Sequence, residues 1–230
     1  MTSITASAPF PAPTLADLTL DEIRAMLVRD VAANAAFDGW TMRALDAAAV
    51  RHHIDTDLAR LAFKGGAMTM IDAWFSQVDA AMAERLPPEQ LAAMGMTRRI
   101  TSLIEARLDI MASQRESLRR ALSILAMPHH LARGAKLGWR AADAMWRLAG
   151  DDATDFNHYS KRATLSAVYA STIAVFLDDA SDGHADTRGF LARRIANVMQ
   201  FEKWKASRRA RREMRPSLAR FVGRLRYPPR

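Results

Sequence analysis

Hydrophobic residues recur along the chain every three to four positions, which is the spacing of one face of an α-helix. Such patterns predict helices at residues 19–38, 41–50, 55–63, 67–84, 89–94, 97–112, 115–126, 131–149, 155–178, 185–206 and 217–226. The first helix is predicted to bury Ile23, Met26, Leu27, Val31 and Ala35. No segment alternates with the period of two expected of a strand, so the predicted fold class is all-α.

The ends of these helices carry recognisable signals. Thr19 and Glu22 have the spacing of a capping box, and Pro87-Pro88 ends a later helix. The longest apolar stretch without a charged residue, Ala163–Leu177, has 15 residues. Because roughly 20 residues are needed to span a bilayer, this stretch predicts a buried helix and not a transmembrane one.

The charge of the chain is unevenly distributed and suggests four segments. The net charge is +8, but residues 193–230 contain 13 Lys and Arg against two acidic residues, so the rest is mildly acidic. We predict a flexible arm at 1–18, a head at 19–84, a body at 85–206 and a basic tail at 207–230. We expect no secretory leader. Without Cys there is no disulfide framework, thiolate metal site or Cys nucleophile.

The order of helices between residues 19 and 84 resembles the helix-turn-helix head of TetR-type proteins. A long helix is followed by two short helices joined by a tight turn, and then by a second long helix. The resemblance implies a TetR-like fold of about ten helices, with a helical ligand-binding body behind the head. Asp55 and Asp57 would repel DNA phosphates, and His53 stands near the place where such regulators have Gly. We therefore predict that the head does not bind DNA.

A second set of residues carries a sharper resemblance. It consists of the strings Arg120–Leu125, Pro128-His129, Met145-Trp146, Ala149–Asp151, Thr154–Asn157, Tyr159, Arg162-Ala163, Asp186-Thr187 and Phe190-Leu191. These strings resemble the accessory protein family of ubiquinone biosynthesis, over most of residues 19–205. The resemblance implies a non-catalytic TetR-like protein that binds isoprenoid lipid, lies on a membrane surface and docks the di-iron demethoxyubiquinone hydroxylase.

The same resemblance implies a partner-binding surface made of Met145, Trp146, Asp155, Phe156, His158, Tyr159 and Arg162. His158 stands where many members have Trp, and it offers less apolar area to a partner. Asp155 has an alternative role at the positive end of a helix dipole, and Phe156 has one as a core anchor. Met145 and Trp146 are adjacent, so they cannot both face one core stripe.

The sequence contains no motif for catalysis or for a resident cofactor. None of the six histidines lies in a His-Glu-x-x-His motif, and the Glu-x-x-His motif of di-iron bundles is absent. Gly-rich phosphate loops and a nucleophile elbow are also absent. We therefore expect no enzyme activity, no metal and no cofactor apart from a bound lipid or quinone ligand.

The basic tail has the pattern of an interfacial helix. Its apolar stripe consists of Leu218, Phe221, Val222 and Leu225, while Arg220 and Arg224 lie mainly off the stripe. This arrangement is typical of helices that lie on anionic membranes, and the resemblance implies the same role. Phe201 and Trp204 would extend the apolar contact. Docking on the protein's own body and binding to nucleic acid are the alternatives.

These observations favour a protein that presents an isoprenoid quinone intermediate to the hydroxylase. In a bacterium it would lie on the inner face of the cytoplasmic membrane, and in eukaryotic relatives on the mitochondrial matrix side. No pocket residue can be named, although methionines adapt well to flexible chains; ordinary core packing is the alternative for Met68, Met70, Met94, Met96, Met111 and Met127. Rival functions are a TetR-type ligand-responsive repressor and a helical interaction protein. A homodimer is one state that TetR-like bodies often adopt.

Overall fold

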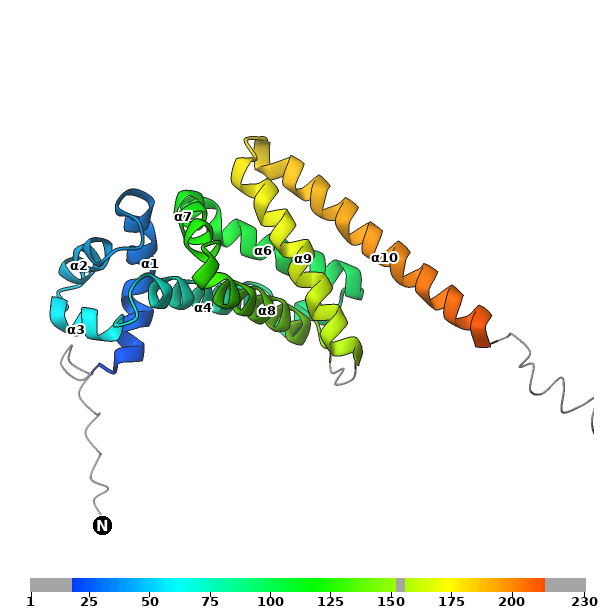
Figure 1. Cartoon of the computed structure of the whole chain (residues 1–230), viewed down its shortest axis with the longest axis horizontal. Helices are drawn as coiled ribbons and strands as arrows, with labels where there is room; N and C mark the ends of the chain where they lie inside the picture. Colours follow the sequence, from blue (N-terminus) through cyan, green and yellow to red (C-terminus); the bar gives the residue numbers. More distant parts are fainter. Residues whose placement is uncertain (1–17, 152–155, 214–230) are drawn as a thin grey trace, which may run out of the picture.

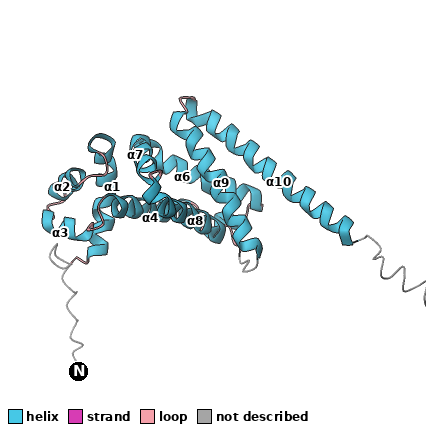
Figure 2. Cartoon of the chain, in the orientation of Figure 1, coloured by secondary structure: helices cyan, strands magenta, loops and turns pink. Residues whose placement is uncertain are grey.

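The computed structural model describes residues 18–151 and 156–213, and every regular element in them is a helix (Figure 1, Figure 2). The first helices in chain order are α1 (Leu20–Asp38), α2 (Met42–Arg51), α3 (Thr56–Ala62), α4 (Ala67–Arg85) and α5 (Pro88–Ala92). They are followed by α6 (Met96–Met111), α7 (Arg115–Leu125), α8 (Leu131–Leu148), α9 (Phe156–Asp178) and α10 (Ala185–Glu213). The predicted all-α class is confirmed.

The first helices begin where the capping signals stand in the sequence. The N–H of Glu22 donates to Thr19 Oγ1 (3.3 Å), and the N–H of Thr19 donates to Glu22 Oε2 (2.8 Å), which completes the capping box of α1. Asp55 caps α3 by accepting from the N–H groups of Asp57 and Leu58, at 2.9 and 3.0 Å. The carboxylate of Asp55 thus serves the amide groups of its own helix.

The buried face of α1 lacks Met26, which was predicted to belong to it, and includes Val28 and Ala32, which were not. Ile23, Leu27, Val31 and Ala35 are fully buried, but the exposed fraction of Met26 is 36%. The neighbours α2, α3, α4 and α7 cover the side of α1 that also carries Val28 and Ala32. Met26 lies beyond the opposite edge of this arc, so its predicted burial was wrong.

His53 occupies a left-handed position in the turn between α2 and α3. Its φ is 55°, a conformation that costs a residue with a side chain about 1 kcal/mol relative to Gly. The turn is closed by hydrogen bonds from His53 N to Val50 O (3.2 Å) and from Ile54 N to Ala49 O (2.9 Å). This is the place where the sequence analysis expected Gly in a working regulator.

The head and the body share one hydrophobic core. Trp40, which follows α1, packs against Trp74 of α4 with ring centroids 5.4 Å apart. Trp40 Nε1 donates to the backbone oxygen of Ser117 in α7 (3.0 Å), and Trp74 Nε1 donates to the side chain of Gln114 (2.9 Å). The core therefore continues across the predicted border between residues 84 and 85.

The last helix is longer than predicted. α10 leaves α9 and continues away from the body to Glu213, whereas the sequence analysis ended it at residue 206 (Figure 1). Residues 203–213 contain neither Gly nor Pro and are rich in Arg, Lys and Ala, which favour helix. The predicted border between body and tail, at residues 206 and 207, consequently falls inside a helix.

The turn between α9 and α10 is held by a buried carboxylate. Asp179 accepts hydrogen bonds from the N–H groups of Ser181 (2.8 Å) and Thr187 (2.9 Å) and from both of their hydroxyl groups. Arg115 of α7 donates to the backbone oxygens of Leu177 (3.0 Å) and Asp179 (2.7 Å). The direction in which α10 leaves the body is thereby fixed.

Replacing Asp179 by Asn is expected to lower the free energy of unfolding at pH 7, because the amide nitrogen cannot accept these hydrogen bonds. Hydrogen bonds from the Ser181 and Thr187 side chains hold the pKa of Asp179 well below its usual range. The stabilisation is therefore complete above the unfolded-state pKa of about 3.9 and is lost as the pH falls towards the lower folded-state pKa. Urea unfolding at pH 7 and pH 3 measures both effects.

The neighbouring variant Asp178→Asn serves as the control, since the Asp178 side chain is 77% exposed and only pairs with Arg119. Equal destabilisation by the two variants, or a loss for Asp179→Asn that does not shrink at low pH, would contradict this account.

Candidate functional site: an apolar cavity beneath the last helix

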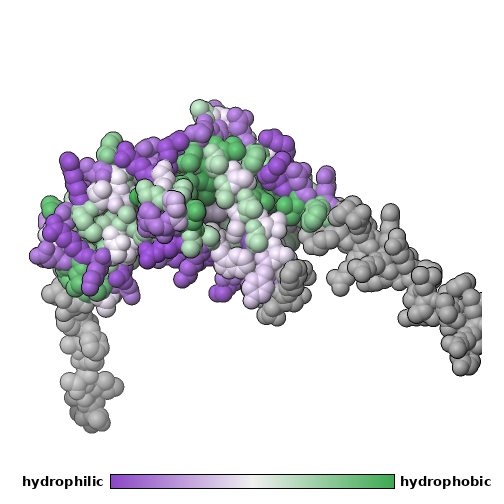
Figure 3. All heavy atoms as spheres, in the orientation of Figure 1, coloured by the Kyte–Doolittle hydropathy of each residue, from purple (hydrophilic) through white to green (hydrophobic). Residues whose placement is uncertain are grey.

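A cavity of about 300 Å³ lies between α6, α8, α9 and α10. In Figure 3, hydrophobic residues gather on the visible face where α9 and α10 run side by side. The apolar part of the cavity wall comes mainly from Met96, Ile100, Leu165, Val168, Ile195 and Val198. Since α10 packs chiefly on α9 and α6, the side chains of its first half form one wall of this cavity.

One end of the cavity wall is polar. The indole Nε1 of Trp146 is shielded from solvent and donates no hydrogen bond within the described residues. The ammonium group of Lys161 lies 5.3 Å from the centre of the Trp146 ring and pairs with Asp151. The wall therefore suits a ligand with an apolar body and one polar group.

The methionines named from the sequence do not line this cavity as a group. Met96 lies in its wall, whereas Met70 and Met111 are fully buried in the core. Met68 lines a separate hollow beside α8, and Met127 is 44% exposed. The Sδ of Met94 lies 3.9 Å from the Ser102 hydroxyl. For Met70 and Met111, core packing is the role that the structure assigns.

A second cavity, of about 210 Å³, lies on the α7 side of α9. Small residues of α8 and α9 leave this space open, and a Cβ atom at Gly138 would meet no atom within 4 Å. Arg107 and Tyr169 form its polar wall, where Arg107 Nε donates to Tyr169 Oη (2.9 Å). Arg107 also pairs with Asp79 of α4.

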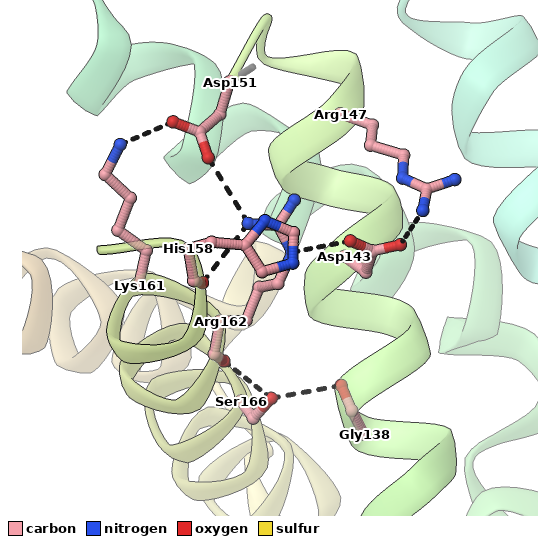
Figure 4. A network of polar contacts seen from close by, with 8 residues as sticks. All are labelled: Gly138, Asp143, Arg147, Asp151, His158, Lys161, Arg162 and Ser166. Carbon is pink, nitrogen blue, oxygen red and sulfur yellow. Dashed lines mark hydrogen bonds and ion pairs between the residues drawn. The ribbon is translucent and has the colours of Figure 1, made fainter. Parts of the chain in front are cut away.

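A network of ion pairs joins α8 to α9 beside the first cavity (Figure 4). Arg162, only 1% exposed, donates to Asp143 through Nε (2.6 Å) and lies 3.4 Å from Asp151 through Nη1. Arg147 also pairs with Asp143 (2.9 Å), and Lys161 with Asp151. The two strings that contain Asp151 and Arg162 in the sequence therefore meet in space.

The residues predicted to bind a partner are divided between core and surface. Met145 is fully buried and Arg162 is nearly so, which leaves them no surface for direct contact with a partner. Of the adjacent pair Met145 and Trp146, Met145 is thus the core residue, and Trp146 faces the cavity. Phe156 is the first residue of α9, and Asp155 lies outside the described residues.

The exposed part of this surface is aromatic. The Tyr159 side chain is 61% exposed, and its ring lies 5.2 Å from His158 and 6.1 Å from Trp139 of α8. Sequence reasoning missed Trp139. The signal was its spacing of seven residues from Trp146, which places both on nearly the same face of α8.

The predicted membrane-binding residues lie mostly outside the described part of the chain. Phe201 is 55% exposed on α10, and Trp204 belongs to the same helix. The predicted stripe of Leu218, Phe221, Val222 and Leu225, with Arg220 and Arg224, lies outside the described residues. Among residues 18–151 and 156–213, no helix is both long and apolar enough to cross a bilayer.

The surface of α3, the helix expected to face DNA in a regulator, carries a neutralised cation. Arg60 donates to Asp46 through Nε (3.0 Å) and Nη2 (2.8 Å), and it lies 3.5 Å from Asp57.

His129 and His130, with ring centroids 4.1 Å apart, lie in the short turn before α8. In the part of the chain that the structure describes, no three His, Asp or Glu side chains gather as a metal site requires.

Comparison with known proteins concerns the family to which this chain is similar. Residues 131–202, which contain the ion-pair network, match the model of the COQ9 family. The human protein named ubiquinone biosynthesis protein COQ9, mitochondrial, is 32% identical over 168 residues, covering 70% of this chain and 52% of that protein. The family predicted from the sequence is confirmed. The COQ9 protein of Drosophila melanogaster is 22% identical over 187 residues, covering 80% of this chain and 57% of that protein.

The chain spans about half the length of the curated COQ9 relatives that it matches. Among solved structures, a crystal structure of a TetR transcriptional regulator from Nitrosomonas europaea superposes with a TM-score of 0.63. The match covers 77% of this chain and 98% of that regulator at 24% identity. This likeness confirms the predicted TetR-like fold of the COQ9-like chain, and it concerns the fold alone.

The buried position of Arg162 predicts a role in stability. Arg162→Met leaves the carboxylates of Asp143 and Asp151 with one cation each and removes the ion pair between Asp143 of α8 and Arg162 of α9. We expect a loss of about 3 kcal/mol in the free energy of unfolding, measured by urea denaturation. The control Arg147→Met removes a cation from the same Asp143, but its side chain is 74% exposed, so the loss should stay below about 1 kcal/mol. Equal losses would contradict the assignment.

Proposed function

We propose that this chain is a non-catalytic, lipid-binding accessory protein of ubiquinone biosynthesis. It binds isoprenoid quinone intermediates at a membrane surface and presents them to the demethoxyubiquinone hydroxylase, which carries out the chemistry. The observation that carries the proposal is the apolar cavity beneath α10, with Trp146 and Lys161 in its wall. The names of the COQ9 relatives support the pathway.

The form of the cavity suits a prenylated ring. Its volume of about 300 Å³ lies at the lower end of the range for small-molecule pockets, so it holds only part of a long prenyl chain. Aliphatic side chains from Ile100, Val168 and Val198 would contact isoprene units. The ammonium group of Lys161, which also lines the cavity, would donate to a quinone or phenol oxygen.

The hydroxylase would dock on the aromatic surface formed by Trp139, His158 and Tyr159. Tyr159 is the exposed member of this cluster, and exposed aromatic residues are common anchors of protein interfaces. His158 and Tyr159 lie at the start of α9 beside Lys161, which also lines the cavity. A ligand in the cavity would therefore lie next to a bound hydroxylase.

Membrane attachment would place α10 and the basic tail on an anionic leaflet. The exposed Phe201 and the Arg-rich segment after it supply the apolar and cationic parts of an interfacial contact. In a bacterium this corresponds to the inner face of the cytoplasmic membrane. The DNA-binding alternative is disfavoured by α3, where Arg60 is paired with Asp46 and Asp57 lies at the start of the helix.

Filling the cavity should displace the lipid. Val198→Trp introduces a large side chain from α10 into the cavity, whereas Ala196→Trp introduces the same residue at an exposed position of the same helix. We expect extracted lipid per protein to fall at least about fivefold for Val198→Trp and to be unchanged for Ala196→Trp. Quantitative mass spectrometry of purified protein measures this, and equal lipid content in the two variants would reject the cavity as the binding site.

Docking of the hydroxylase is tested separately. Tyr159→Ala removes an exposed aromatic ring from the proposed interface and should weaken hydroxylase binding by at least about tenfold. The control Phe37→Ala removes a ring that is 86% exposed on the head and should leave binding unchanged. Binding is measured by interferometry with purified hydroxylase, and an equal effect of the two substitutions would overturn the assignment of the interface.

A further inference from the structure

A third hollow, of about 340 Å³, lies between α4 and α8, away from α10. Its floor is apolar and contains Met68, which is 7% exposed, and Leu137. Its rim is polar and strongly cationic, with Thr69 and Asp72 from α4 and Arg133, Lys136 and Arg140 from α8. Leu137 also lines the cavity on the α7 side of α9, so it separates the two spaces.

The charges around the hollow do not cancel. Arg140 pairs with the Asp72 carboxylate, donates to its backbone oxygen (3.2 Å) and lies 3.5 Å from Asp79. The only carboxylate of the rim is therefore already neutralised. In the described part of the chain, neither Arg133 nor Lys136 has an ion-pair partner. Two cations thus face the hollow without a counterion.

The spacing of these cations makes the arrangement unfavourable when the hollow is empty. Residues 133 and 136 are three positions apart, so their unpaired charges share one face of α8 and repel each other. The hollow also borders the first turn of α4, where the cap residue Gly66 supplies no side-chain hydrogen bond. The positive end of this 19-residue helix adds to the field of the side chains.

We propose that this hollow binds a phosphate monoester group. A phosphate dianion matches the two unpaired cations in charge, the Arg133 guanidinium can hold two of its oxygens, and Lys136 can hold a third. The Thr69 hydroxyl is a further donor. Met68 and Leu137 receive the small organic part of the ligand. The site is independent of the cavity beneath α10 and does not rest on the proposed lipid function.

Two ligands share this chemistry, and paired probes distinguish them. Glycerol 3-phosphate represents a free phosphate ester, and vesicles of phosphatidylcholine with phosphatidic acid present the same group as a lipid headgroup. Binding is measured on the full chain at low ionic strength, by calorimetry for the soluble probe and by vesicle flotation for the lipid. Inorganic sulfate at equal concentration controls for general anion attraction.

The test variant is Arg133→Gln with Lys136→Gln, and both positions are exposed, so the fold should be retained. The matched control, Arg98→Gln with Lys64→Gln, removes the same charge at exposed positions outside the hollow and outside α10. The test variant should weaken binding of the effective probe at least about tenfold, while the control leaves it unchanged. Asp72→Asn removes the only carboxylate charge of the rim and should tighten binding about threefold, a gain that misfolding cannot imitate.

Saturable binding of glycerol 3-phosphate with this pattern identifies a free phosphate ester as the ligand. The same pattern with phosphatidic acid vesicles alone identifies a phospholipid headgroup. Equal losses in the test and control variants, equal competition by sulfate, or no binding of either probe would overturn the proposal.

Discussion

The position of α9 depends on one buried cation. Arg162 holds two carboxylates of α8 and of the segment that follows it, and almost none of its surface reaches solvent. A buried guanidinium is tolerated only when its donors are satisfied, so Asp143 and Asp151 must lie where they do for α9 to pack at all. Both cavities and the aromatic surface use side chains from α8 and α9. Their geometry therefore depends on this arrangement.

α9 divides the body into two apolar spaces. The first space lies between α9 and α10, and α10 packs on the body along one side only. The second space lies on the α7 side of α9, where α8 contributes small residues. Protein interiors are normally filled to the density of organic crystals, and two adjacent unfilled spaces in one helical layer are a departure from that rule. In α8, the absence of a side chain at Gly138 leaves open space on the α7 side, whereas Gly134 lets α8 approach Leu125 of α7 closely.

Local patterns predicted the helices well because helix period and capping are encoded in neighbouring residues. The start of α1 at Thr19 and of α3 at Asp55 follow from side chains that bond their own helix. Long-range packing was harder to predict. The burial of Met26 was assigned wrongly because the direction from which neighbours cover α1 is not a local property. The helix α10 continues past residue 206 because residues 203–213 favour helix and contain neither Gly nor Pro to end it.

The site was only partly accessible to sequence reasoning. The resemblance selected the right segment, but it could not separate residues that contact a partner from residues that support them. Met145 and Trp146 are neighbours in the chain, and only the three-dimensional packing shows that the first is core and the second borders a cavity. Trp139 and the α10 side chains Ile195 and Val198 join the site through tertiary contacts that no single motif contains.

α10 packs on the body along one side only and is held at its first residues by the Asp179 turn. Moving α10 away from the body exposes a few side chains such as Ile195 and Val198. The free energy of this movement is therefore set by the burial of those side chains. Opening the space beneath α10 therefore needs less free energy than unfolding the body, and α1 to α9 can keep their arrangement.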